Sequence, residues 1–135
     1  MKRIIFFVFL LLLLLLTYCT LNKVPHNEEL RESVFFIVKD KSNTEISMNT
    51  LTDFDWDKGF LIPPYSSQES IDKQLGVHFS DPSSIDFRDD IYLFVFMKDN
   101  EVVQYVEMDV QDAKFTLGGR KYLTPLDDVI IIERY

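Results

Sequence analysis

Glycine, cysteine and histidine are scarce in this chain of 135 residues, which has four glycines, one cysteine and two histidines. One cysteine cannot form an intramolecular disulfide, so packing alone must hold the fold together. Four glycines do not supply a phosphate-binding loop, and no serine lies in a Gly-x-Ser-x-Gly elbow. Because these catalytic motifs are missing, we expect no enzymatic activity and no cofactor.

Positive charge is also in the minority. The 22 acidic residues outnumber the 14 basic ones, so the net charge is −8, and it is −10 for the part that follows Lys2 and Arg3. So acidic a protein repels phosphate groups, and we therefore expect no nucleic acid partner and little attraction to anionic lipid headgroups. A cationic peptide or a basic protein is compatible with this charge. Twelve phenylalanines and six tyrosines supply the side chains for a packed core.

The first 19 residues carry the most specific pattern in the chain. Lys2 and Arg3 precede an uninterrupted apolar run, Ile4 to Leu16, as the charged and apolar regions of an export signal do. As a helix, this run spans about 20 Å, and extension to Leu21 gives about 27 Å, against a hydrocarbon core of ~30 Å. Positive residues stay in the cytoplasm. We therefore expect residues 1–19 to be a signal peptide or membrane anchor and the rest to face the extracytoplasmic side of the cell membrane.

The only cysteine, Cys19, follows this run directly. The segment Leu16-Thr17-Tyr18-Cys19 resembles the lipobox of bacterial lipoproteins, in which the cysteine carries the lipid. The family pattern has Gly, Ala or Ser where this chain has Tyr18. The resemblance implies lipid attachment at Cys19, and an uncleaved anchor or ordinary secretion are the alternatives. Both the lipid-bearing form and the uncleaved anchor bind the membrane through the N-terminal segment.

Composition divides the remainder into a tether and a single domain. Residues 20–33 are polar with one proline, which predicts a tether. Residues 34–135 have an ordinary length for one domain, by the usual range of about 100–150 residues. Within this domain, Ser66 and Glu69 form a capping box, and Gly76 is placed to end the helix that the box begins.

Antiparallel sheet is predicted for most of the domain. Asp99-Asn100 suits a type I′ turn, and the resulting register sets Leu93 opposite Val106. Gly118-Gly119 predicts a second hairpin over residues 115–122. These segments indicate an α+β fold with about five or six antiparallel strands and one or two short helices packed on one face. Further expected strands are Val34–Val38, Trp56–Ile62 and Val129–Ile132, while Ile46–Leu51 is ambiguous between strand and helix.

Aromatic residues and prolines gather in one block of the domain. Trp56, Pro64 and Tyr65 are candidates for a platform that binds a sugar or a peptide, with packing in the core as the alternative. The segment Phe54-Asp55-Trp56-Asp57, followed by Pro63-Pro64-Tyr65, resembles a block of small lipoproteins and exported proteins of Gram-positive bacteria. This resemblance covers roughly 25 residues. It implies a structural signature at a strand-to-helix junction and carries no known activity.

The first of two aspartate groups does not predict a metal site. Asp53, Asp55 and Asp57 have the spacing that opens a calcium-binding loop. Lys58 and Pro64 stand where that loop needs glycine and glutamate, so the pattern fails. In an extended segment the three aspartates share one face, which indicates a solvated strand face.

The second group lies in one loop and comprises Asp81, Asp86, Asp89 and Asp90, with His78 nearby. Carboxylates with a histidine can hold a metal or act as acid and base. A small envelope hydrolase or metal-binding enzyme is therefore an alternative function. A polar loop that turns at Asp81 is the simpler interpretation.

These observations predict location better than activity. We expect a membrane-anchored extracytoplasmic protein whose domain is a non-catalytic interaction module of the cell envelope. Its partner would be an envelope protein or a cationic peptide. An immunity or inhibitor protein is a further alternative that fits the size and the acidity of the chain. The main hypothesis requires no metal ion and no catalytic residue.

Overall fold

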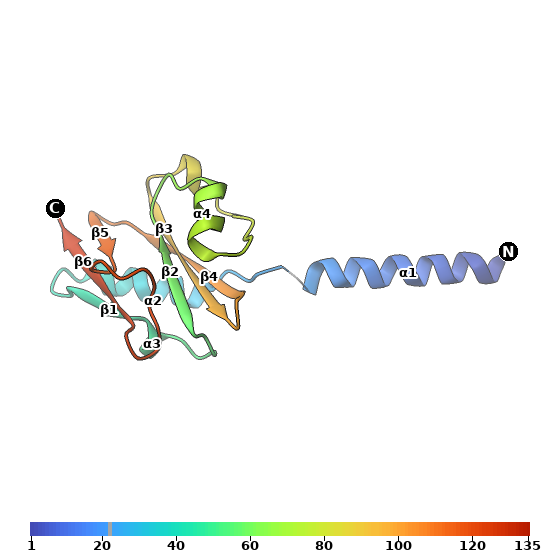
Figure 1. Cartoon of the computed structure of the whole chain (residues 1–135), viewed down its shortest axis with the longest axis horizontal. Helices are drawn as coiled ribbons and strands as arrows, with labels where there is room; N and C mark the ends of the chain where they lie inside the picture. The colour runs from blue at the N-terminus through green and yellow to red at the C-terminus, as the bar shows by residue number, and fades with distance from the viewer. Residues whose placement is uncertain (22) are drawn as a thin grey trace.

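The computed structural model describes residues 1–21 and 23–135, and the side chains of all of these except residues 18–21. An N-terminal helix is followed by a domain of two three-stranded antiparallel sheets (Figure 1). The α+β fold with six antiparallel strands in the described residues is therefore confirmed. The helices are α1 (Lys2–Leu21), α2 (Glu28–Lys39), α3 (Met48–Leu51), α4 (Gln68–Leu75) and the 3₁₀ turn η1 (Ile85–Phe87). The strands are β1 (Glu45–Ser47), β2 (Lys58–Ile62), β3 (Ile91–Lys98), β4 (Glu101–Asp109), β5 (Ala113–Thr116) and β6 (Val129–Arg134).

The sheet β2-β3-β4 is covered on both faces. β3 is its middle strand, and every residue from Ile91 to Met97 is buried. Alternate side chains of a strand point to opposite faces. Phe94 and Phe96 therefore enter one core, and Leu93 and Val95 enter the other. Burial on both faces explains why β3 reads as a continuous apolar run instead of an alternating one.

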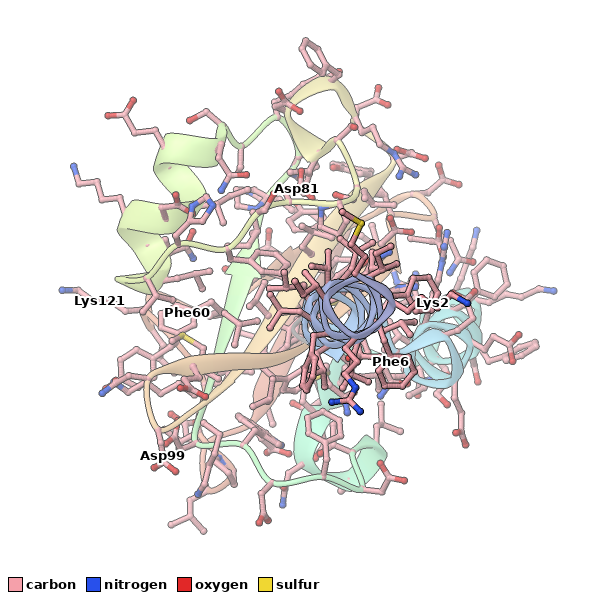
Figure 2. All side chains as sticks on the ribbon, turned by 90° about the vertical axis from the view of Figure 1, so that its right-hand side faces the viewer. Lys2, Phe6, Phe60, Asp81, Asp99 and Lys121 are labelled. Atoms are coloured by element: carbon pink, nitrogen blue, oxygen red, sulfur yellow. The ribbon has the colours of Figure 1, made fainter. Side chains whose placement is uncertain are left out.

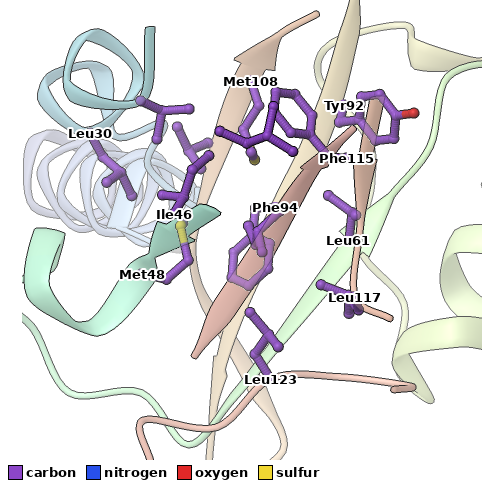
Figure 3. Close-up of a cluster of buried hydrophobic side chains, with 14 of the residues drawn as sticks. Leu30, Ile46, Met48, Leu61, Tyr92, Phe94, Met108, Phe115, Leu117 and Leu123 are labelled. Atoms are coloured by element: carbon purple, nitrogen blue, oxygen red, sulfur yellow. The ribbon is translucent and has the colours of Figure 1, made fainter. Parts of the chain in front are cut away.

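The first core lies between this sheet and the second sheet, β1-β6-β5, with α2 packed along β4. Phe94 is fully buried at its centre (Figure 3). Its ring meets that of Phe96 edge-on, with 4.9 Å between the ring centroids. Other members of this core are Leu30, Ile46, Met48, Leu61, Tyr92, Met108, Phe115, Leu117 and Leu123.

The second core covers the opposite face of the same sheet. It is closed by α4, through Ile71 and Leu75, and by the loop at 77–90, through Phe79 and Ile85. α4 has only eight residues, and a helix this short needs a surface to pack on. The two cores together leave neither face of β3 open to water from Ile91 to Met97.

α1 stands away from the domain (Figure 1). Its apolar side chains from Ile4 to Leu16 are 44–69% exposed. Among the described residues, no helix is both long and apolar enough to cross a membrane. These side chains are left uncovered by the rest of the described chain.

The strand expected at Val34–Val38 is wrong, because these residues form the second half of α2. Leu30 and the two valines recur every fourth residue and are each at most 1% exposed. This helical period does not show in a window of five residues. The side chain of Asn27 caps the helix by accepting a hydrogen bond from Leu30 N at 2.9 Å. Residues 28–33, which composition assigns to the tether, therefore lie in α2.

The β3–β4 hairpin has the expected turn but a corrected register. Both residues of Asp99-Asn100 have positive φ, 50° and 62°, as a type I′ turn requires. A register shift just before Met97 then sets Phe94 opposite Val106, where the turn alone predicts Leu93. The shift is a β-bulge, which adds one residue to β4.

The second expected hairpin, over residues 115–122, is wrong. Gly118 and Gly119 do form a turn, with φ of 64° and 86°. Phe115, however, pairs with Ile132 of β6 and not with Tyr122. The partner of β5 lies beyond a long loop, so the turn residues carry no information about it.

α4 begins one residue later than the capping box predicts. Ser67 is the cap, because its Oγ accepts a hydrogen bond from Ser70 N at 3.1 Å. Ser66 Oγ instead donates to the carbonyl oxygen of Pro63 at 2.7 Å. Gly76 ends the helix in the left-handed conformation (φ 75°), as expected.

Substitution of Ser67 by alanine tests this assignment. We expect Ser67→Ala to lower the free energy of unfolding by about 1 kcal/mol, because one N-terminal amide of α4 loses its acceptor. Ser66→Ala is the matched control, and we expect a smaller loss because its hydroxyl bond is exposed and lies outside the helix. Urea denaturation followed by circular dichroism measures both. Equal losses would contradict the cap at Ser67.

Candidate functional site

The structure does not bring the three residues of the expected ligand platform together. Trp56 is only 4% exposed, and its Nε1 donates to Thr52 Oγ1 at 3.0 Å. Its ring packs against Phe96 in the first core, with 5.4 Å between the centroids. Pro64 is half-buried and Tyr65 is 63% exposed. They follow the opposite end of β2, about 16 Å away at ~3.3 Å per residue of the strand.

Tyr65 is the one member of this block that offers aromatic surface. Its φ is 62°, in the left-handed region that bulky side chains rarely adopt. Its amide donates to the carbonyl oxygen of Ile85 at 2.9 Å, which fixes the turn before α4 against η1. Residues held in such sparsely populated backbone conformations cluster at functional sites. Tyr65 therefore stays a candidate residue for contact with a ligand.

The predicted lipid attachment at Cys19 lies outside the side chains that the structure describes. The backbone of this residue belongs to the last turn of α1. Lipid attachment thus stays a prediction.

The aspartates of the loop between α4 and β3 hold that loop and its neighbours in place. Asp81 accepts hydrogen bonds from two backbone amides of its own loop, at 2.8 and 2.9 Å. Asp90 forms a two-bond pair with Arg88, both at 2.8 Å, and this guanidinium lowers the pKa of the Asp90 carboxyl. Asp86 and Asp89 are exposed. In the described part of the chain, no three His, Cys, Asp or Glu side chains lie close enough to hold a metal ion.

His78 lies beside a different aspartate. Its Nδ1 is 2.6 Å from a carboxylate oxygen of Asp72. Asp72 also accepts from Phe79 N at 3.0 Å and from the side chain of Gln68 at 2.8 Å. These hydrogen bonds, the one with His78 first, lower the pKa of the Asp72 carboxyl. Asp72 thereby ties α4 to the start of the loop that closes the second core.

A large concave surface lies beside α4. A hollow of about 720 Å³ lies between α4, β2 and residues 120–122. A second hollow, of about 260 Å³, continues it toward β5 and shares Gln74, Arg120 and Lys121 with it. We name the two together the basic groove. The cations that line it are Lys58, Lys73, Lys114, Arg120 and Lys121.

The charge of the basic groove is opposite to that of the protein. It gathers five of the twelve lysines and arginines that follow Arg3, and no acidic residue lines either hollow. Arg120 is paired with Asp127, and Lys114 lies 4.0 Å from Glu133. The remaining three cations form no ion pair with the described carboxylates. They are Lys58, Lys73 and Lys121.

Sequence reasoning missed this groove because its cations come from four separate segments. β2, α4 and β5 contribute one lysine each, and only Arg120-Lys121 supplies two neighbouring cations. That dipeptide is the only adjacent basic pair after Lys2-Arg3 and is the one local signal. Comparison with known proteins adds no further signal, since no family model, curated protein or solved structure matches this chain.

The lowered pKa of Asp72 predicts a pH dependence of stability. A carboxyl whose pKa is lower in the folded state stabilises the fold above its unfolded pKa of about 3.9, and loses this contribution as the pH falls through the folded value. We expect the free energy of unfolding to fall as the pH drops from about 5 toward 2, and to fall less steeply in Asp72→Asn.

Urea denaturation at a series of pH values measures this difference in slope. Asp89→Asn is the matched control, because it removes an exposed aspartate outside these hydrogen bonds. Its curve should run parallel to that of the unsubstituted protein. A parallel curve for Asp72→Asn would contradict the role of Asp72.

Proposed function

We propose that this chain is an extracytoplasmic protein held at the cell membrane by its N-terminal segment, with a domain that acts as a non-catalytic interaction module. The observation that carries the proposal is α1, whose side chains from Ile4 to Leu16 are 44–69% exposed. A continuous apolar surface of this kind is unfavourable in water and favours a lipid environment. Lys2 and Arg3 precede it, an order that favours a cytoplasmic N-terminus and an exported domain. In the lipoprotein form, a lipid on Cys19 replaces this helix as the membrane attachment.

Binding is the activity that the domain supports best. A hydrolase needs an acid and a base, or a metal, converging on a cleft. The lining of the basic groove offers lysines, an arginine and the side-chain amide of Gln74 instead. Asp81, Asp90 and Asp72 use their oxygens to hold loops. We therefore favour an interaction module over a hydrolase or metal-binding enzyme that uses the aspartate loop.

Fatty-acid labelling tests the attachment. In cells grown with an alkyne-bearing fatty acid, we expect the full chain to be labelled and to sediment with the membranes, and Cys19→Ser to be unlabelled. An unlabelled chain that still sediments with the membranes would exclude the lipid and leave α1 as the anchor. A chain recovered without membranes would contradict the proposal in both forms.

Crosslinking in cells tests the interaction. We expect the full chain, crosslinked in place and purified, to bring down a specific envelope protein, because the exported domain presents a groove with unpaired charge. The matched control keeps residues 1–33 and carries an unrelated domain behind them. Recovery of the same proteins with the control, or of none with the full chain, would count against an interaction module.

A further inference from the structure

The basic groove points to a particular kind of partner. We infer that it binds an extended acidic peptide segment of another protein, with carboxylates against its lysines and apolar side chains over its floor. This inference rests on the proposed function, because the partner protein is expected at the cell envelope. The argument for it comes from the charge of the groove, its floor, and the hydrogen bonds that its lining has already formed.

The unpaired lysines indicate that the ligand carries negative charge. Lys73 of α4 and Lys121 are exposed, and both line the larger hollow. Lys58 Nζ lies over the ring of Tyr122, 5.1 Å from its centroid, and forms no ion pair. Three cations without counter-charge in one hollow repel a cationic peptide, although the net charge of the protein favours one. The same three cations attract carboxylates.

The floor of the groove distinguishes a peptide from other polyanions. Phe60 and Leu75 form its base, each 6% exposed, and Tyr122 is 39% exposed beside them. The rings of Phe60 and Tyr122 are 5.6 Å apart. Figure 2 shows Phe60 and Lys121 on the same flank of the domain. A phosphate polymer supplies charge alone, whereas a peptide with alternating acidic and apolar residues contacts both the lysines and the apolar floor.

The charged side chains of the lining differ in how far they are already engaged in hydrogen bonds. The guanidinium of Arg120 is occupied by Asp127 and by the carbonyl oxygens of Leu117 and Val129. The ring of Tyr92 packs edge-on against that of Phe115 in β5, with 5.1 Å between the centroids, and both residues line the smaller hollow. The charged donors that stay free of ion pairs in this lining are the ammonium groups of Lys58, Lys73 and Lys121. These act as point charges and suit carboxylates on flexible side chains.

Fluorescence anisotropy of the full chain in detergent micelles tests the inference. The probe is a labelled synthetic peptide of alternating glutamate and leucine, at about 0.15 M salt, where charges beyond ~8 Å are screened. The groove variant is Lys73→Gln/Lys121→Gln. The matched control is Lys39→Gln/Lys41→Gln, because Lys39 occupies the last turn of α2 as Lys73 occupies the last turn of α4. All four lysines are exposed, so both variants should unfold like the parent.

We expect the groove variant to bind the peptide about tenfold more weakly and the control variant to bind it within about twofold of the parent. A peptide with glutamine for glutamate should not bind. Equal losses in the two variants, or no binding by the parent, would overturn the inference. So would inorganic polyphosphate that displaces the peptide at equal charge concentration, because the site would then select charge alone. Concentration-dependent dimers that the groove variant loses would assign the groove to a second copy of this chain.

The crosslinking experiment separates this inference from the proposed function. If the groove variant and the parent bring down the same envelope protein in equal amounts, the groove is not the binding site and the interaction module stands. If neither brings down a partner while the peptide still binds, the proposed function fails and the acidic-peptide site stands.

Discussion

Burial of β3 on both faces is the constraint on which the rest of the domain depends. Its side chains require two separate covers, because alternate residues enter opposite cores. The sheet β1-β6-β5 and α2 supply one cover, and α4 with the loop at 77–90 supplies the other. Gly59 of β2 shows how tight the first core is, since a Cβ there would lie 2.3 Å from the ring of Phe94. The basic groove forms where α4, laid on this sheet, stops short of residues 120–122.

The parts of the fold that sequence reasoning predicts are those with a local chemical cause. Asp99-Asn100 tolerates positive φ, and Gly76 adopts the left-handed conformation that ends a helix, so each specifies its own turn. α2 is not predicted, because the five apolar residues Val34–Val38 resemble a strand. The helical period becomes visible only when Leu30 is included. Leu30 lies among charged residues that resemble a tether. The pairing of β5 with β6 is a long-range contact, and the turn after β5 does not encode it.

The candidate site also combines residues that the sequence makes recognisable with residues that only the fold brings together. The block from Trp56 to Tyr65 is recognisable in the sequence, but the burial of each side chain depends on the elements that pack against it in the fold. This packing buries Trp56 in the first core and leaves Tyr65 outside. The basic groove has no linear signal beyond Arg120-Lys121, because its other cations come from β2, α4 and β5, which lie far apart in the sequence. Such a site becomes visible only after α4, β2 and β5 have been placed.

Net charge and local charge act over different distances, which reconciles an acidic protein with a groove for acidic ligands. The net charge of −10 after Arg3 repels an acidic partner from afar, but salt screens this repulsion beyond about 8 Å. Within the groove, contacts with Lys58, Lys73 and Lys121 are shorter than this screening distance. The apolar floor adds a hydrophobic contribution to the binding free energy, which salt does not weaken. A nonspecific polyanion therefore meets repulsion over most of the surface. An acidic segment that fits the groove avoids this repulsion, because it contacts the lysines and not the acidic surface around them. The acidic surroundings therefore make the groove selective for shape as well as for charge.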